Sequence, residues 1–272
     1  MAPLLGTTVD DVLEEVLDEG PDDLFVVNPS ADMIESVIET ATHYEGELPE
    51  IRMLADRRLL KNVMDDFLVA TNAADLIEAD TLSLRTVEDS TRSSLFVTES
   101  QIVALVTADD NVGGLVTDDE EFVDAAYETV EADWEAADEY TLRTPGISRI
   151  RQTLDDEISP EVEEDFENVL ASLESARGDG DGLDEVTISL LVAARNRVLL
   201  YDISKWGEDV GIASKATFSR TKTKLEDMGL IDTEKVPIDV GRPRLRLKLA
   251  DERLQDSDPS ELANVAQSIL AS

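Results

Sequence analysis

The side chains with the clearest capacity for chemistry lie in the last third of the chain. Residues 213–248 hold nine Lys and Arg against five Asp and Glu, a local net charge of +4 (9 − 5). The whole chain of 272 residues holds 23 basic and 62 acidic residues, for a net charge of −39. Because this basic segment opposes the charge of the rest of the chain, it predicts an anionic partner.

The first part of this segment predicts a helix. Ser214 is placed to cap a helix over Lys215–Leu225, in which Phe218 and Leu225 are seven residues apart and share one face. Basic and hydroxyl side chains occupy the remaining faces, and they suit the phosphates and base edges of a major groove. We therefore expect double-stranded DNA to contact Ser214, Lys215, Thr217, Ser219, Arg220, Thr221, Lys222 and Lys224.

Elements on both sides of this helix complete a winged helix-turn-helix. Two helices are predicted before it, over residues 186–194 and 198–209, and Gly211 permits the tight turn that follows them. Strands at 231–236 and 244–249 come after it, joined by a turn at 239–243, and leucines alternate with basic residues in the second strand. A wing of this kind reaches phosphates or the minor groove, and its expected contacts are Arg242, Arg244 and Arg246.

Residues for several other chemistries are missing. The chain has no Cys, which excludes disulfides, thiolate catalysis and zinc fingers, and its one His, His43, has no Gly-x-Ser-x-Gly companion. Residues 178–182 alternate Gly with Asp, but the pattern fits neither a phosphate loop nor a calcium loop, so we interpret it as a linker. We expect no enzymatic activity, no cofactor and no metal.

The first half of the chain alternates predicted strands and helices. Strands are expected at 24–27, 51–54, 81–87, 95–97 and 102–106, with helices at 31–43, from Arg57 to Leu68 and at 120–140, and a turn at Asn111–Gly114. This succession predicts an α/β N-terminal domain with an open sheet, followed by a C-terminal helical region with the winged helix-turn-helix. The predicted domains are a sensor or dimerisation domain at 1–144, a helical connector with a Gly/Asp linker at 145–183, and the DNA-binding domain with a C-terminal helix at 184–272.

Polar residues follow the predicted strands of the N-terminal domain. Ligands of open α/β sheets sit at the carboxyl ends of strands, where helix N-termini offer free N–H groups. A small phosphorylated metabolite such as a sugar phosphate would suit the arginines found there, although ion pairs on an acidic surface explain them at least as well. A dimerisation domain without a ligand is a further alternative. The candidate ligand residues are Asn28, Ser30, Arg57, Arg58, Arg92 and Ser93.

The acidity of the chain points to a salt-rich environment. A surface with this net charge repels itself in dilute salt, and concentrated counterions screen the repulsion. We interpret it as adaptation to the cytoplasm of a halophile; an acidic mesophilic protein is the alternative. No apolar run is long enough to span a bilayer and no signal sequence is evident, so we expect a soluble cytoplasmic protein without a membrane partner.

Three segments resemble a known family. Residues 202–231, 25–30 and 64–75 are similar to haloarchaeal transcriptional regulators of the TbsP type. The resemblance implies control of genes of central carbon metabolism, including gluconeogenesis, beside the sugar-responsive regulator TrmB. Lys222 departs from winged helices in general, where a Leu packs at that position, and this leaves the rotation of the reading helix open by one residue.

The residues are compatible with three classes of function. The preferred class is a homodimeric transcription regulator with a metabolite-sensing domain. The second is an enzyme fused to a winged helix, and the third is an adaptor whose winged helix binds protein. The alternating basic residues are also compatible with an ordinary solvated strand face.

Overall fold

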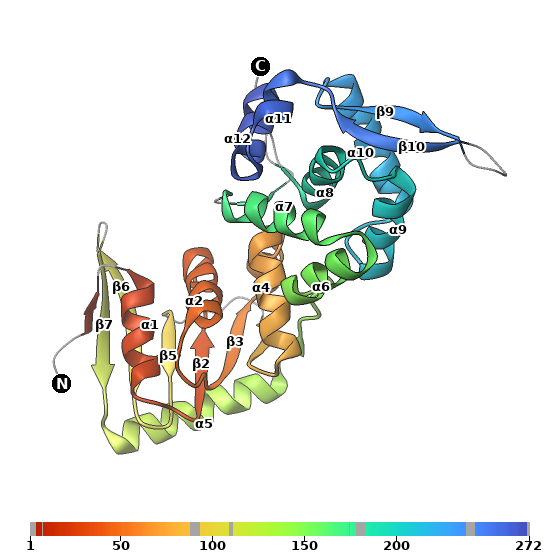
Figure 1. Ribbon diagram of the computed structural model, residues 1–272. Helices are drawn as coiled ribbons and strands as arrows, with labels where there is room; N and C mark the ends of the chain where they lie inside the picture. Colours follow the sequence, from red (N-terminus) through yellow and green to blue (C-terminus); the bar gives the residue numbers. More distant parts are fainter. Residues whose placement is uncertain are drawn as a thin grey trace. The chain divides into compact units, whose positions relative to one another are not determined.

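The chain folds into two compact units in the computed structural model (Figure 1). The structure describes residues 4–6, 8–87, 93–108, 111–173, 175–177, 183–237 and 243–270. Unit 1 comprises Met1–Asp65 and Asn72–Leu142, and unit 2 comprises Asp66–Thr71 and Arg143–Ser272. The chain therefore contributes a short early segment to unit 2 before it completes unit 1.

Unit 1 is built on an eight-stranded sheet of order β1-β7-β6-β5-β2-β3-β4-β8. Strands β2, β3 and β4 are parallel to one another, and every other pairing in the sheet is antiparallel. All five residues of β2 are buried, as expected for a central strand covered on both faces. The strands are β1 (Leu4–Gly6), β2 (Asp23–Val27), β3 (Glu50–Asp56), β4 (Leu82–Val87), β5 (Leu95–Val97), β6 (Ile102–Ala108), β7 (Asn111–Thr117) and β8 (Asp138–Glu139).

Helix α5 covers one face of this sheet. Val123 and Val130 of α5 share an apolar cluster with Phe25, Val97 and Ile102, which occupy neighbouring positions on three adjacent strands. Tyr127 and Trp134 of the same helix meet the ring of Phe25 edge-on, with centroid separations of 5.4 and 6.1 Å. The helices of unit 1 are α1 (Val9–Asp18), α2 (Ala31–His43), α3 (Arg57–Val63), most of α4 (Phe67–Glu78) and α5 (Glu120–Ala136).

Two expectations for this unit are wrong. The helix expected from Arg57 to Leu68 is two helices, because the chain turns after Val63 and the Asp66 carboxylate accepts a hydrogen bond from the N–H of Leu68 (3.0 Å) at the start of α4. The turn expected at Asn111–Gly114 is instead the first half of β7, which pairs residue by residue with β6. The short edge strands β1 and β8 were not anticipated. The open α/β sheet itself is confirmed.

Unit 2 is largely helical, and its described residues share a large apolar core. Phe166, Leu190, Trp206 and Phe218, from four helices, belong to this core, and each has at most 1% of its surface exposed. The helices of the predicted connector, α6 and α7, are part of the same core. The elements are α6 (Ile147–Glu157), α7 (Pro160–Ala171), α8 (Glu185–Arg195), α9 (Leu200–Val210), α10 (Lys215–Asp227), β9 (Ile231–Val236), β10 (Arg244–Leu249), α11 (Glu252–Asp256) and α12 (Pro259–Leu270).

A buried carboxylate, that of Asp66, links the segment Asp66–Thr71 to the rest of unit 2. Asp66 is 3% exposed and accepts a hydrogen bond from the backbone N–H of Ala176 (3.3 Å). Its other oxygen pairs with the guanidinium of Arg177 at 3.3 Å, and neighbouring Phe67 lies in the core of the unit. This pairing compensates for the cost of burying the charge. In the parts of the chain that the structure describes, no helix combines the length and apolar character required to cross a membrane.

Candidate nucleic-acid interface

Helices α9 and α10 meet through a tight turn at Gly211. Gly211 has a φ of 103°, in the left-handed region that favours glycine, and the carbonyl of Gly207 accepts hydrogen bonds from the N–H groups of Ile212 (2.8 Å) and Ala213 (3.2 Å). Ser214 then caps α10, because its hydroxyl accepts a hydrogen bond from the N–H of Thr217 (3.2 Å). These contacts set where α10 begins.

The two helices touch most closely at Gly207 and Phe218. A Cβ atom at position 207 would lie 2.4 Å from two atoms of the Phe218 ring, which is closer than van der Waals contact allows. Phe218 and Leu225 are buried at 0% and 2% exposure and anchor one face of α10 in the core. The rotation of α10 about its axis is therefore determined by close packing at this crossing.

The opposite face of α10 presents a continuous exposed strip. Its positions recur three or four residues apart, which places them on one side of a helix. The last residue of α10 on this side, Asp227, is acidic and also exposed. We call the five exposed residues that precede it the recognition strip: Ala216, Ser219, Arg220, Thr223 and Lys224.

Two cations of the strip are free of carboxylates. Among the described residues, no Asp or Glu lies within 4.0 Å of the charged nitrogens of Arg220 or Lys224, and Arg220 Nη2 donates a long hydrogen bond to Thr217 Oγ1 (3.4 Å). Both side chains are thus available to an external anion. Both belong to the basic segment 213–248, whose local charge predicts an anionic partner.

The other basic residues expected on α10 form ion pairs with carboxylates of the protein. The ammonium of Lys215 pairs with the carboxylate of Glu208 on α9. The side chain of Lys222 is 12% exposed and pairs at 2.6 Å with Glu226, which also accepts a hydrogen bond from Thr233 on β9 (3.0 Å). Lys222 therefore lies on the packed side of α10, away from the recognition strip, and Glu226 neutralises its charge.

The serine and threonine residues expected to contact DNA also fall into two groups, those in the recognition strip and those outside it. Ser214 and Thr217 form the cap and hydrogen-bond to each other (3.0 Å), and Thr221 is half-buried. Ser219 is exposed within the strip, as expected. Thr223 was not among the residues predicted from the sequence; it follows Ser219 by four residues, and its hydroxyl donates to the carbonyl of Ser219 (3.1 Å). That spacing was the signal that could have identified it.

The hairpin β9–β10 forms the wing. It pairs in antiparallel register from Arg244 opposite Val236 to Leu249 opposite Ile231. An isolated bridge between Leu199 and Arg246, with the hydrogen bond from Leu247 N to Val198 O (2.9 Å), adds the segment before α9 to its edge. Arg242 lies outside the described residues, and so do positions 239–242 of the expected turn.

The described cations of β10 each contact a carboxylate. Arg244 pairs with Asp202 on α9 (3.4 Å), and its guanidinium also lies over the ring of Tyr201, 4.5 Å from the centroid. Arg246 pairs with Glu234 (3.5 Å) and Lys248 with Asp232 (2.8 Å), both across the hairpin. The Lys248 hydrogen bond holds the pKa of Asp232 below its ordinary value. The three side chains remain 36–41% exposed, so these pairs are at the surface and weak.

The candidate ligand residues of unit 1 are distributed around the strand ends. Ser30 caps α2 through the N–H of Met33 (3.3 Å), and Asn28 adopts a positive φ of 48° just after β2. Arg57 contacts Thr86 (3.1 Å) and Asp138 (3.8 Å), whereas Arg58 and Ser93 are exposed. Arg92 lies outside the described residues.

The first turn of α3 already carries an anion. The Asp56 carboxylate accepts hydrogen bonds from the N–H groups of Arg58 (2.8 Å) and Leu59 (3.0 Å). This carboxylate supplies the negative charge that a phosphate would otherwise bring to the helix N-terminus. A ligand at the strand ends would therefore depend on the side chains of Arg57 and Arg58.

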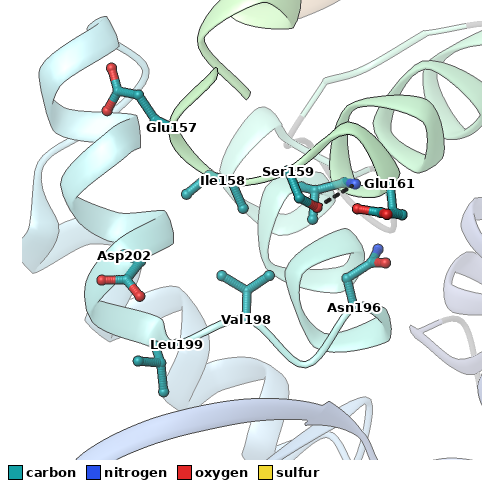
Figure 2. Close-up of a pocket in the computed structure, with 9 residues that line it drawn as sticks. Glu157, Ile158, Ser159, Glu161, Asn196, Val198, Leu199 and Asp202 are labelled. Carbon is teal, nitrogen blue, oxygen red and sulfur yellow. Dashed lines mark hydrogen bonds between the residues drawn. The ribbon is translucent and has the colours of Figure 1, made fainter. Parts of the chain in front are cut away.

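Unit 2 contains a pocket of about 430 Å³ that the sequence did not predict (Figure 2). It lies between the α6–α7 turn and the segment that joins α8 to α9. Three carboxylates line it, which disfavours a phosphate, and no cluster suited to a metal ion occurs in the described parts of the chain. The lining residues are Glu157, Ile158, Ser159, Glu161, Val162, Asn196, Val198, Leu199 and Asp202.

Two family models match this chain. Residues 1–145 match the family described as "Transcriptional regulator TbsP-like, N-terminal", and residues 146–267 match "Transcriptional regulator TbsP-like, C-terminal HTH domain". No curated protein matches the chain. Among solved structures, the chain is similar to TrmBL2, described as an archaeal chromatin protein that shows a novel mode of DNA binding, with 13% sequence identity and a TM-score of 0.36.

That similarity covers 51% of this chain and 53% of the TrmBL2 chain, so the matched region spans about half of each protein. The two family matches together extend over residues 1–267. The chain belongs to the family of TbsP-like transcriptional regulators and carries the helix-turn-helix domain of that family in its C-terminal half.

Proposed function

We propose that this regulator reads double-stranded DNA by inserting the recognition strip of α10 into the major groove, with the wing β9–β10 against the flanking backbone. The observation that carries the proposal is the pair of exposed cations, Arg220 and Lys224, that lack a carboxylate partner among the described residues. In a chain of net charge −39, exposed cations on a helix of this kind suit a polyanion.

The strip divides naturally between base and backbone contacts. Arg220 lies at its centre, and a guanidinium forms two hydrogen bonds to the O6 and N7 of guanine. Ser219 and Thr223 flank it with short hydroxyls, and Ala216 offers a methyl group to a thymine. Lys224, near the C-terminal end of the helix, is better placed for a phosphate, which an ammonium binds as a point charge.

To contact DNA, the remaining cations would have to exchange their carboxylate partners for phosphates. Lys215, Arg244 and Arg246 each contact a carboxylate of the protein, and DNA phosphates would replace or share those contacts. Counterion release contributes little to binding in concentrated salt, so base contacts carry more of the affinity. We therefore expect an affinity for DNA that depends only weakly on salt concentration.

The finer features of the function follow the family resemblance and the composition. We infer a homodimer in the cytoplasm of a halophile, acting on genes of central carbon metabolism that include those of gluconeogenesis. Unit 1 serves as the sensor of a small anionic metabolite or as the dimerisation domain, and exposed Arg58 supports the first of these roles. We infer that it has no enzymatic activity of its own, because both family matches are domains of transcriptional regulators.

Gel shifts with genomic fragments in molar potassium chloride test the proposal. The double variant Arg220→Ala/Lys224→Ala should lose at least about tenfold in affinity, because a good base contact alone is worth about 1–3 kcal/mol. Lys61→Ala, which removes an exposed cation from α3 in unit 1, is the matched control and should bind like the wild type.

The companion variant Arg220→Ala/Lys215→Ala should also lose the shift. If both double variants bind as tightly as the wild type, α10 does not read DNA and the assignment of the interface is wrong. If the wild type shifts no genomic fragment at any salt concentration, the adaptor function is favoured instead.

A further inference from the structure

The three strands at one edge of the sheet in unit 1 contain no charged residue. Strands β1, β7 and β6 are adjacent in the sheet and contain 17 residues (3 + 7 + 7), none of which is Asp, Glu, Lys or Arg. Charged residues make up 31% of the chain, so a segment of this size would ordinarily hold about five (0.31 × 17). Charge is absent from buried strands in general, but it is also depleted at the centre of surfaces that another protein covers, so the exposed part of these strands is informative.

The uncharged strands have one face that unit 1 leaves open. The register places Leu115 beside Ala104 and Gly113 beside Val106, on the same face as Ile102 and Val97. Helix α5 covers Ile102 and Val97, which are buried at 6% and 0% exposure. Strand β5 begins at Leu95, which pairs with Ala104, so the part of β6 after Ala104 extends past the start of β5. The apolar face continues beyond the helix that covers its beginning.

Large apolar side chains are exposed on this part of the sheet and at the start of α5. Val106 is 49% exposed and Leu115 is 58% exposed, and Phe122, in the first turn of the helix α5 that follows β7, is 59% exposed. These are three of the five large apolar side chains that are exposed in the described parts of the chain. We call Ala104, Val106, Gly113 and Leu115 the uncharged sheet face; Phe122 follows the end of β7 by five residues, in the helix that covers the neighbouring part of the same face. An apolar patch of this kind marks an interaction site.

We propose that the uncharged sheet face is the interface at which two copies of this chain form a homodimer. A nucleic acid or an anionic lipid surface requires cations, and these three strands have none. A second copy offers a surface matched to this one, because in a two-fold interface each uncharged strand faces the same strands of its partner. With 62 Asp and Glu in the chain, other surfaces would commonly place carboxylates against Leu115 and Val106, which is costly.

This proposal supplies the surface for the homodimer inferred under the proposed function, and its test does not depend on DNA. The molar mass of the full-length protein is measured by sedimentation velocity over a range of concentrations, in 0.1 M and 2 M potassium chloride. The wild type should sediment as a species of about 60 kDa, twice the chain mass of 29.8 kDa. Dimerisation should strengthen at the higher salt concentration, because screening weakens the repulsion between two chains of −39.

Substitutions then locate the interface. Leu115→Asp should give a monomer at concentrations at which Met228→Asp, an exposed apolar residue of unit 2 at 44% exposure, leaves the dimer intact. Circular dichroism checks that both variants fold. Phe122→Ser provides a second disruption at a residue so exposed that its loss leaves the core of unit 1 unchanged, and it should weaken the dimer by at least about tenfold, since interface aromatics commonly contribute more than 1 kcal/mol.

The absence of cysteine permits an independent mapping. In the single variants Leu115→Cys and Met228→Cys the new thiol is the only one in the chain. A bis-maleimide should join two copies through position 115 and leave position 228 monomeric on a denaturing gel. A wild type that is monomeric in both salts, or a dimer that persists in Leu115→Asp and Phe122→Ser alike, would overturn the proposal while leaving the DNA-binding assignment untouched.

Discussion

Lys215, the first residue of α10, is held by Glu208 of the preceding helix. The carboxylate of Glu208 pairs with the Lys215 ammonium and also accepts a hydrogen bond from the backbone N–H of Lys215 (3.3 Å). The hydrogen bond from the Lys215 ammonium lowers the pKa of Glu208, so the carboxylate is charged at any pH near neutrality. A fixed anion thus lies at the end of α10 where the DNA backbone is expected, and binding must overcome it.

Removing that anion should tighten DNA binding. Glu208→Gln frees Lys215 for a phosphate, and we expect an affinity about threefold to tenfold higher, with a steeper dependence on salt because one more cation contacts DNA. Asp209→Asn is the matched control, since it removes the same charge from the same helix but releases Lys205, which is not part of the recognition strip. Fluorescence anisotropy titrations from 0.5 to 3 M potassium chloride measure both quantities. Equal gains in the two variants would contradict a specific role for the Lys215 pair.

Replacing Gly207 should disturb the crossing of α9 and α10. In Gly207→Ala the new methyl group would overlap the Phe218 ring, and overpacking of this kind typically costs about 1–3 kcal/mol. We expect lower stability in urea and weaker DNA binding, because α10 must shift. The second substitution Phe218→Leu makes room for the methyl group, so the double variant should be less damaged than the sum of the two single variants. Strict additivity in this double-mutant cycle would show that the two residues do not meet.

Glu185 should make the stability of unit 2 depend on pH. This half-buried residue lies in the first turn of α8, and burial raises the pKa of its carboxyl above the ordinary value of 4.5. The native state then binds more protons than the unfolded state between pH 4.5 and the raised pKa, so stability falls as the pH rises through this window. Glu185→Gln removes the effect, and its gain in melting temperature should be larger at pH 8 than at pH 5.

The control for this variant is Glu161→Gln. Glu161 occupies the first turn of α7, where a hydrogen bond from Ser159 lowers the pKa of its carboxyl. The sign is therefore opposite: its charged form is favoured in the native state, and Gln should bring no gain at pH 8. A gain of the same size in both variants would indicate a general effect of net charge instead of burial at Glu185.

Salt should stabilise the whole chain. With a net charge of −39, the native state gains from screening of its own repulsion, and counterions at molar concentration reduce the screening length to about 3 Å. We expect the melting temperature to rise by several degrees between 0.1 and 2 M potassium chloride at pH 7.5. Replacing a block of surface carboxylates outside the DNA interface, such as Asp118, Glu120 and Glu121, by Asn and Gln should reduce that rise. A melting temperature independent of salt would argue for the acidic mesophilic alternative.

Elements defined by local signals were predicted closely. Helix α2 runs from Ala31 to His43 as expected, because Ser30 caps its start and the apolar residues recur at helical spacing. Strands β9 and β10 begin and end at the predicted residues, since their alternation is local. The winged helix-turn-helix that they complete is confirmed by the fold and by the family match of residues 146–267.

Features that depend on distant residues were not predictable. The break before α4 relies on Asp66, whose partners Ala176 and Arg177 lie more than 100 residues later in the sequence. The paired glycines Gly113 and Gly114 indicate a turn by type, but pairing with β6 makes them a strand. The engagement of Lys222 by Glu226 also depends on the position of β9. A single sequence carries no direct record of such contacts.

The segment Asp66–Thr71 has a practical consequence for dissecting this regulator. A gene fragment that starts at residue 143 or 146, where unit 2 resumes and where the family match of the C-terminal domain begins, would omit Phe67 and Asp66. The expressed fragment would have a cavity in its core where Phe67 packs, and Arg177 would lose its ion pair with Asp66. Its failure to fold or to bind DNA would then reflect the missing segment and not the capacity of the winged helix. A fusion that supplies residues 66–71 through a short linker is the appropriate minimal DNA-binding fragment.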